Sequence, residues 1–96
     1  MESSLQVEAL EAAAFAHARI VELEERHLDT VNHLSGSWSI EAREQYHFYK
    51  GVRTTCIRLV LEVLGADTAC EFLTAMYNEA YQMRQQEALE DVGANL

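Results

Sequence analysis

The chain has no proline and only four glycines among its 96 residues. Proline and glycine disfavour helices more than any other residues, so their scarcity argues against a fold built from many turns. Alanine, leucine, glutamate and glutamine are instead abundant, and all four favour helices. The composition therefore predicts an all-α protein.

Basic residues are also scarce. Seven lysines and arginines stand against sixteen aspartates and glutamates, which gives a net charge of −9. A surface of this sign repels phosphate groups and disfavours ordinary binding of nucleic acid through counterion release. The apolar share of 49% is ordinary for a folded domain, so the charge does not predict disorder.

Targeting and membrane-spanning segments are not evident in the sequence. No basic and apolar leader stands at its start, and no apolar run approaches the roughly twenty residues that a membrane span requires. The two cysteines, Cys56 and Cys70, do not form a C-x-x-C motif. We therefore expect a cytoplasmic protein with free thiols.

Motifs of catalysis are missing too. The sequence contains no glycine-rich phosphate loop, no spacing that supports a serine, histidine and aspartate triad, and no zinc-type pair of cysteines or histidines. Cys56 falls on an apolar helix face and is interpreted as a small core residue. We expect a protein that is not an enzyme and needs no cofactor.

Helical spacing of apolar residues defines three segments of one domain, residues 1–96. We expect helices over about residues 4–34, 40–64 and 68–90, with residues 92–96 frayed. Ser35-Gly36-Ser37 and Gly65 are the predicted stops, and Asp67 is a plausible cap of the third helix. Because the predicted loops are short, consecutive helices should be antiparallel neighbours in a three-helix bundle.

Each predicted helix has an apolar face that should turn inward. These faces comprise Leu5, Ala9, Ala13, Ala16, Ile20, Leu23, His27, Val31 and Leu34; then Ala42, Tyr46, Tyr49, Val52, Cys56, Leu59, Val60 and Val63; and last Ala69, Phe72, Leu73, Met76, Ala80 and Met83. A first helix of about thirty residues would be about 45 Å long. That length is large for a compact bundle of this size, so the helix should bend or pack against a second chain.

Two Glu-x-x-His pairs raise the possibility of a carboxylate-bridged metal centre, Glu24 with His27 and Glu44 with His47. Helical rotation places His27 on the apolar face, with Tyr46 as its expected hydrogen-bond partner, but places His47 on the outer side of the second helix. The two pairs should therefore not converge within one chain. A metal site completed by a second chain remains an alternative.

Aromatic residues gather near the first predicted turn. Trp38, Phe48 and Lys50 form the first candidate for a contact patch there, because aromatic and basic side chains are common at protein interfaces. The alternative is that Trp38 only fastens the start of the second helix to the bundle. Gly51, in the middle of that helix, should either mark a kink or let another backbone approach.

Acidic residues are distributed unevenly along the chain. Residues 1–35 and 66–96 each have five more acids than bases, whereas residues 36–65 have one more base than acids. On the first helix a row of carboxylates lies away from the apolar face and is interrupted at Phe15 and Ala18. It comprises Glu8, Glu11, Glu22, Glu25 and Asp29. Carboxylates one helical turn apart have a spacing of about 5 to 7 Å, similar to phosphates along a strand. The row can be a partner-binding surface or a solvated face.

A short, acidic, all-helical chain with this carboxylate row resembles the small inhibitory proteins of bacteriophages, including anti-CRISPR proteins. The resemblance implies a nucleic-acid mimic that blocks the basic, nucleic-acid-binding surface of a partner complex. Our leading hypothesis is thus a non-enzymatic inhibitor that binds a basic protein. The alternatives are a structural or regulatory homo-oligomer, such as a homodimer, and a metal-binding protein assembled between chains.

Overall fold

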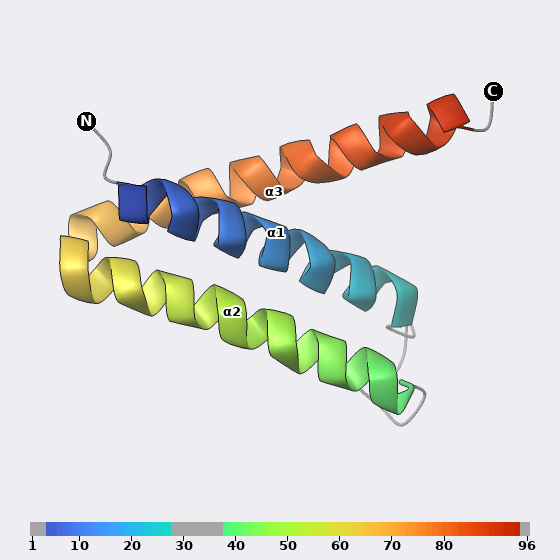
Figure 1. Ribbon diagram of the computed structural model, residues 1–96, viewed down its shortest axis with the longest axis horizontal. Helices are drawn as coiled ribbons and strands as arrows, with labels where there is room; N and C mark the ends of the chain where they lie inside the picture. The colour runs from blue at the N-terminus through green and yellow to red at the C-terminus, as the bar shows by residue number, and fades with distance from the viewer. Residues whose placement is uncertain (1–3, 28–37, 95–96) are drawn as a thin grey trace.

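The computed structural model describes residues 4–27 and 38–94. These residues form three helices, α1 (Ser4–His27), α2 (Ile40–Leu64) and α3 (Ala66–Ala94), and the two ranges contain no strand (Figure 1). The helices pack against one another pairwise. The predicted all-α bundle of three helices is therefore confirmed.

A serine cap begins α2. The side-chain oxygen of Ser39 accepts a hydrogen bond of 3.0 Å from the backbone N–H of Ala42, and so satisfies one of the unpaired donors at the start of the helix. Glu41 in the first turn adds a negative charge where the helix dipole favours it. The start of α2 agrees with its predicted position.

Gly65 alone joins α2 to α3. It has a positive φ of 93°, which glycine adopts without steric strain. Its N–H donates to the carbonyl of Leu61 at 3.1 Å and its carbonyl accepts from the N–H of Ala69 at 3.0 Å, so it ends one helix and begins the next. The prediction that α3 starts near residue 68 with Asp67 as its cap is wrong, because Asp67 already lies in the first turn.

The other predicted boundary of α3 is also wrong. The helix continues past residue 90 to Ala94, so residues 92–94, which were expected to fray, are helical. Strong helix formers such as Ala88 and Leu89 occupy the approach to this end, and no proline follows to stop the helix. Residues 95–96, the predicted end of the first helix at residue 34, and the Ser35-Gly36-Ser37 stop lie outside the described residues.

The three helices form a flat arrangement of 41 × 36 × 20 Å. In Figure 1, α1 and α2 run antiparallel, and α3 turns back at Gly65, crosses α1 and diverges from α2 towards its C-terminal end. A helix with its side chains is about 10 to 12 Å in diameter, so the molecule is about two helices thick. Much of the surface of α2 and α3 is consequently left uncovered.

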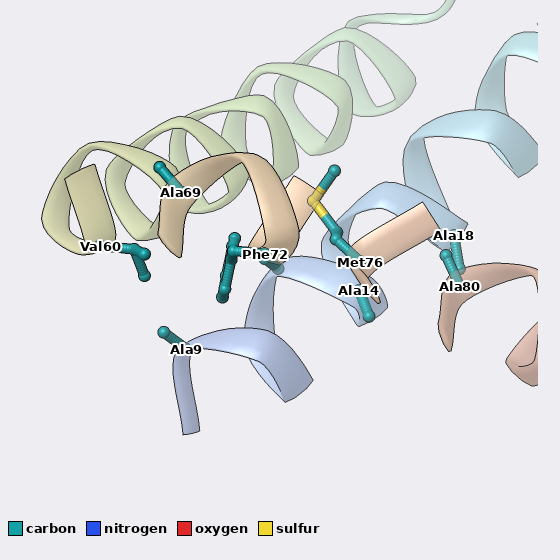
Figure 2. Packing of buried hydrophobic residues seen from close by; sticks show 9 residues of the cluster. Ala9, Ala14, Ala18, Val60, Ala69, Phe72, Met76 and Ala80 are labelled. Carbon is teal, nitrogen blue, oxygen red and sulfur yellow. The ribbon is translucent and has the colours of Figure 1, made fainter. Parts of the chain in front are cut away.

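Small side chains dominate the core. Of the fifteen buried apolar residues in the described ranges, eight are alanines. The larger of the two clusters surrounds Phe72 and Met76 of α3, and it joins all three helices through Ala9, Ala13, Ala14, Ala18, Val60, Ala69 and Ala80 (Figure 2). The second cluster lies between α1 and the start of α2 and comprises Ile20, Leu23, Trp38, Ala42 and Tyr46.

Helix α1 buries more of its circumference than its predicted apolar face. Most of that face is buried as expected, from Ala9 to Leu23, but Ala14 and Ala18 are fully buried as well. Ala18 was expected on the outer side, within the carboxylate row. The reason is that α1 lies between α2 and the C-terminal half of α3 and packs against both.

Helix α2 buries less of its predicted face. Leu59 and Val63 were expected inside but are 38% and 57% exposed. The buried face of α2 is defined by Ala42, Tyr46 and Val60, and Leu59 lies about 100° around the helix from Val60. No described helix covers that side of α2, because α1 and α3 both pack on the side that carries Val60.

Candidate interaction surface

A groove between α1 and α3 gathers acidic residues of α3 beside Phe15 of α1. Its lining comprises Phe15, Glu79, Gln82, Met83, Gln86, Glu87 and Glu90. We call this feature, together with Glu8 and Glu11 on the adjoining surface of α1, the acidic groove.

Helical spacing explains why these residues meet. Glu79, Met83, Gln86 and Glu90 follow one another at intervals of four, three and four residues, which keeps them on one side of α3. Glu8, Glu11 and Phe15 follow at intervals of three and four and form a similar row on α1. The crossing of the helices then places Phe15 against the row of α3.

Two apolar side chains, Phe15 and Met83, form the floor of the acidic groove. Phe15 is 47% exposed although it is a large aromatic residue, and Met83 is half-buried. The ring of Phe15 is held from two sides, by the Arg19 guanidinium 5.3 Å from its centroid and by the edge of Tyr49 with 6.0 Å between centroids. An ordered, exposed ring of this kind can anchor an apolar side chain of a partner.

Arg19 contacts two residues of the groove, Phe15 and Glu87, and so joins the two helices. Its Nη2 donates to both carboxylate oxygens of Glu87, at 2.6 and 2.5 Å, and its Nη1 contacts Glu22 at 2.8 Å. Glu22 also accepts from Arg26 at 2.9 Å. The carboxylates of Glu22 and Glu87 are thus already paired.

The predicted carboxylate row of α1 therefore divides into two parts. Glu22 is ion-paired with Arg19 and Arg26 within α1, whereas Glu25 accepts from Arg84 of α3 at 2.5 Å and so helps to hold α1 and α3 together. Glu8 and Glu11 are exposed and form no ion pair within the described residues. Asp29 lies outside the described residues. The carboxylates available to a partner are consequently Glu8 and Glu11 together with Glu79 and Glu90, which form no described ion pair either.

The residues of the predicted aromatic patch are separated. Trp38 is buried, with its ring edge-on to Tyr46 at 5.1 Å, and so fastens the start of α2 to the bundle. The Lys50 ammonium lies 5.0 Å from the Tyr46 ring on one side of α2. Phe48 is 64% exposed and points to another side, where it contacts Tyr49.

The Glu-x-x-His residues also do not come together in the part of the chain that the structure describes. Glu44 and His47 are exposed on α2, and Glu24 is half-buried on α1. His27 is the last residue of α1, but its side chain, with the predicted contact to Tyr46, lies outside the described residues. Among the described side chains, no group of three or more histidines, cysteines, aspartates or glutamates could hold a metal ion.

His17, which the sequence analysis did not single out, joins all three helices. Its Nδ1 lies 2.8 Å from Nη1 of Arg53 on α2, and its ring is edge-on to Tyr77 of α3 at 4.8 Å. Because arginine can only donate, Nδ1 accepts and the neutral ring has its proton on Nε2. Burial lowers the pKa of His17 from its usual 6.5, and the charges of Arg53 and Arg84 lower it further.

The thiols of Cys56 and Cys70 are free. Burial raises the pKa of the Cys56 thiol, which keeps it protonated and unreactive. Cys70 is exposed on α3. In the described ranges no hydrogen bond joins either cysteine to a histidine, so neither thiol is activated as a nucleophile there.

The missed residues of the acidic groove, Glu79, Glu87 and Glu90, could have been found from the sequence. The same rotation analysis that identified the row on the first helix, applied to the acids of the third, puts Glu79 and Glu90 on one side. Which helix faces that side depends on the crossing of α3 over α1, and the sequence pattern does not give that crossing.

No helix of the described chain is long and apolar enough to span a membrane. Comparison with protein-family models, with curated proteins and with solved structures finds no match to this chain.

Proposed function

We propose that this chain is a non-enzymatic interaction module that binds a basic protein through its acidic groove. The observation that supports the proposal is the combination of an apolar floor, formed by Phe15 and Met83, with carboxylates beside it on both helices that form no described ion pair. The apolar floor provides the kind of contact area that the core of a protein interface has, and carboxylates alone do not provide it.

The shape of the acidic groove favours a helical segment as its ligand. A groove between two helices accepts an amphipathic helix, whose apolar side chains enter the floor at intervals of three and four residues. Lysines and arginines on the flanks of such a helix would meet Glu11 on one edge and Glu79 and Glu90 on the other. The net charge of −9 would draw the partner in from a distance.

The partner class follows from the same chemistry. Basic helices and basic patches are typical of proteins that bind nucleic acid. Occupation of such an element by the acidic groove would compete with the phosphates of its normal ligand. The proposed activity is therefore inhibition of a nucleic-acid-handling protein, as the resemblance to phage inhibitors implies.

Two double variants with the same change in net charge test the proposal. Glu11→Lys with Glu90→Lys puts two cations beside the groove, at exposed positions that form no described ion pair. Glu44→Lys with Glu62→Lys puts two cations on exposed positions of α2. Tagged forms of each are used to capture partners from an extract of the native cell, and the captured proteins are identified by mass spectrometry.

We expect the wild type and the α2 variant to retain the same basic protein, and the groove variant to lose it. Capture should weaken steeply as salt is added, because the attraction is electrostatic. Equal capture by the two double variants would show that overall charge, or another surface, is responsible, and the proposal would then be wrong.

A further inference from the structure

The C-terminal half of α3 differs from the N-terminal half in how it is held to the bundle. In the N-terminal half, four side chains at helical spacing are buried, those of Ala69, Phe72, Met76 and Ala80. None of residues 81–93 is buried, and among them only Met83, Arg84 and Glu87 are half-buried. We call residues 81–93 the α3 arm.

Two ion pairs join the α3 arm to α1, and both are partly exposed. Arg19 of α1 donates to the two carboxylate oxygens of Glu87 at 2.6 and 2.5 Å. Arg84 of the arm donates to Glu25 of α1 at 2.5 Å. The four side chains are between 22% and 60% exposed. The cation belongs to α1 in one pair and to the arm in the other.

Contacts of this kind hold a helix weakly, because water and dissolved ions screen the charges. Loss of one partly exposed ion pair changes an equilibrium by at most about fivefold. Burial of apolar side chains such as Phe72 and Met76 stabilises the N-terminal half of α3 much more. An isolated helix shorter than about 15 residues is marginal in water, and the arm is this short. The closed arm is therefore only slightly favoured over an open one.

The charges at the end of α3 make the arm depend further on the two ion pairs. Glu90 and Asp91 lie in or next to the last turn, where the helix dipole disfavours negative charge. That turn contains no basic residue. The net charge of −9 adds repulsion from the rest of the chain. Arg19 and Arg84 provide the attraction that opposes this repulsion.

We propose that the two ion pairs form a latch, and that the α3 arm opens by local unfolding while the rest of the bundle stays folded. Segments with few buried side chains are the parts of a protein that open at the lowest free energy. Loss of either ion pair should increase the fraction of molecules with an open arm. The core around Phe72 and Met76 should remain folded in those molecules.

An open arm would remove one wall of the acidic groove. Gln82, Gln86, Glu87 and Glu90 belong to the arm, whereas Phe15 stays on α1. A basic partner would find the two walls together only while the latch is closed, so the latch would set the fraction of molecules ready to bind. This consequence rests on the proposed function. The latch itself is a property of the free chain and is tested without a partner.

Hydrogen exchange of single amides, followed by NMR, tests the latch. The amides of residues 85–90 lie before the last turn of α3, so simple fraying of the helix end does not account for their exchange. In the wild type, we expect them to be at least about tenfold less protected than the amides of residues 72–80, because local opening exposes only the arm. Equal protection of both halves would show that α3 opens only as a whole, and the proposal would be wrong.

Two substitutions by glutamine separate the latch from a general effect of charge. Glu87→Gln removes the ion pair with Arg19 and should speed exchange in residues 85–90 by about two- to fivefold. Glu90→Gln makes the same change in charge at an exposed position with no described ion pair, and it keeps an oxygen that can accept from Gln86. This control should not speed exchange, because it removes a negative charge that the helix end disfavours.

Reversal of the second ion pair provides an independent test. Arg84→Glu sets two carboxylates against each other and should speed exchange in the arm by at least about twofold. Glu25→Arg combined with Arg84→Glu restores the pair with its charges reversed, and should return exchange to within about twofold of the wild type. Circular dichroism checks that each variant is folded. Unchanged exchange in Glu87→Gln would overturn the proposal, and so would a double variant that exchanges as fast as Arg84→Glu alone.

Discussion

His17 shows how one residue can link three helices and make stability depend on pH. It accepts a hydrogen bond from Arg53 and contacts Tyr77, and the hydrogen bond requires the neutral ring. Its pKa in the folded protein is lowered below 6.5, first by burial and then by Arg53 and Arg84. The unfolded chain therefore binds the proton more readily than the folded one as the pH falls. Stability contributed by neutral His17 is complete above pH 6.5 and is lost as the pH falls through the lowered pKa.

The first prediction follows from the lowered pKa of His17. His17→Gln keeps an oxygen that can accept the hydrogen bond from Arg53 but does not titrate. The free energy of unfolding, measured by urea denaturation, should fall less steeply for this variant than for the wild type between pH 7 and about pH 5. Parallel curves for the two proteins would mean that other groups account for the pH dependence.

Substitution by alanine should have opposite effects on stability at Gly51, inside α2, and at Gly65, which ends that helix. Gly51→Ala should raise the free energy of unfolding by about 0.5 to 1 kcal/mol, because the helix gains a better helix former and nothing obstructs the new methyl group. Gly65→Ala should lower it by more than about 0.5 kcal/mol, because alanine is strained at a φ of 93°. Thermal or urea denaturation measures both changes, and a destabilising Gly51→Ala would contradict the exposed position of Gly51.

Among the helices, α1 is buried on two sides, and this burial determines which residues of α1 and α3 meet at the candidate site. Ala14 and Ala18 are fully buried and belong to the same cluster as Met76 and Ala80 of α3, so small side chains let the two helices cross closely (Figure 2). The crossing then brings Arg19 to Glu87 and Glu25 to Arg84. These contacts place the row of α3 beside that of α1.

A pair of alanines on α1 provides the prediction at this scale. Ala18→Leu should lower the free energy of unfolding by about 1 to 3 kcal/mol, because a larger side chain overpacks the crossing. Ala12→Leu should change it by less than about 0.5 kcal/mol, because Ala12 is exposed. Urea denaturation of the two variants measures the difference. Similar values would contradict the close packing of α1 on α3.

The apolar faces of the helices could be predicted from their spacing, and the boundaries and the charged contacts could not. Ala9 to Leu23 on α1 and Ala69 to Met83 on α3 follow helical rotation, and all but Leu73 and Met83 among the predicted residues of these spans are buried. Rotation alone does not show how many neighbours a helix has. It therefore missed Ala18, which packs on α3, and misplaced Leu59 and Val63, which α3 does not reach. Whether Glu22 and Glu25 are free or paired depends on the same crossing.

The whole molecule is flat and open, and the acidic groove follows from this shape. A core in which eight of fifteen buried residues are alanines brings the helices together without enclosing them. The acidic groove remains open along α1 and α3, and part of the apolar surface of α2 remains uncovered. The acids are concentrated on the outer two of the three segments in sequence, so the near-neutral α2 differs from its neighbours in charge as well as in exposure.

The central claim, that the acidic groove binds a basic partner, is tested most directly by carboxylate footprinting. The chain is labelled with a carbodiimide, alone and with the captured partner, and each modified residue is identified by mass spectrometry. We predict that Glu8, Glu11, Glu79 and Glu90 are protected in the complex, while Glu44 and Glu62 of α2 react as in the free protein. Protection of Glu44 and Glu62 with unchanged labelling in the groove would contradict the account.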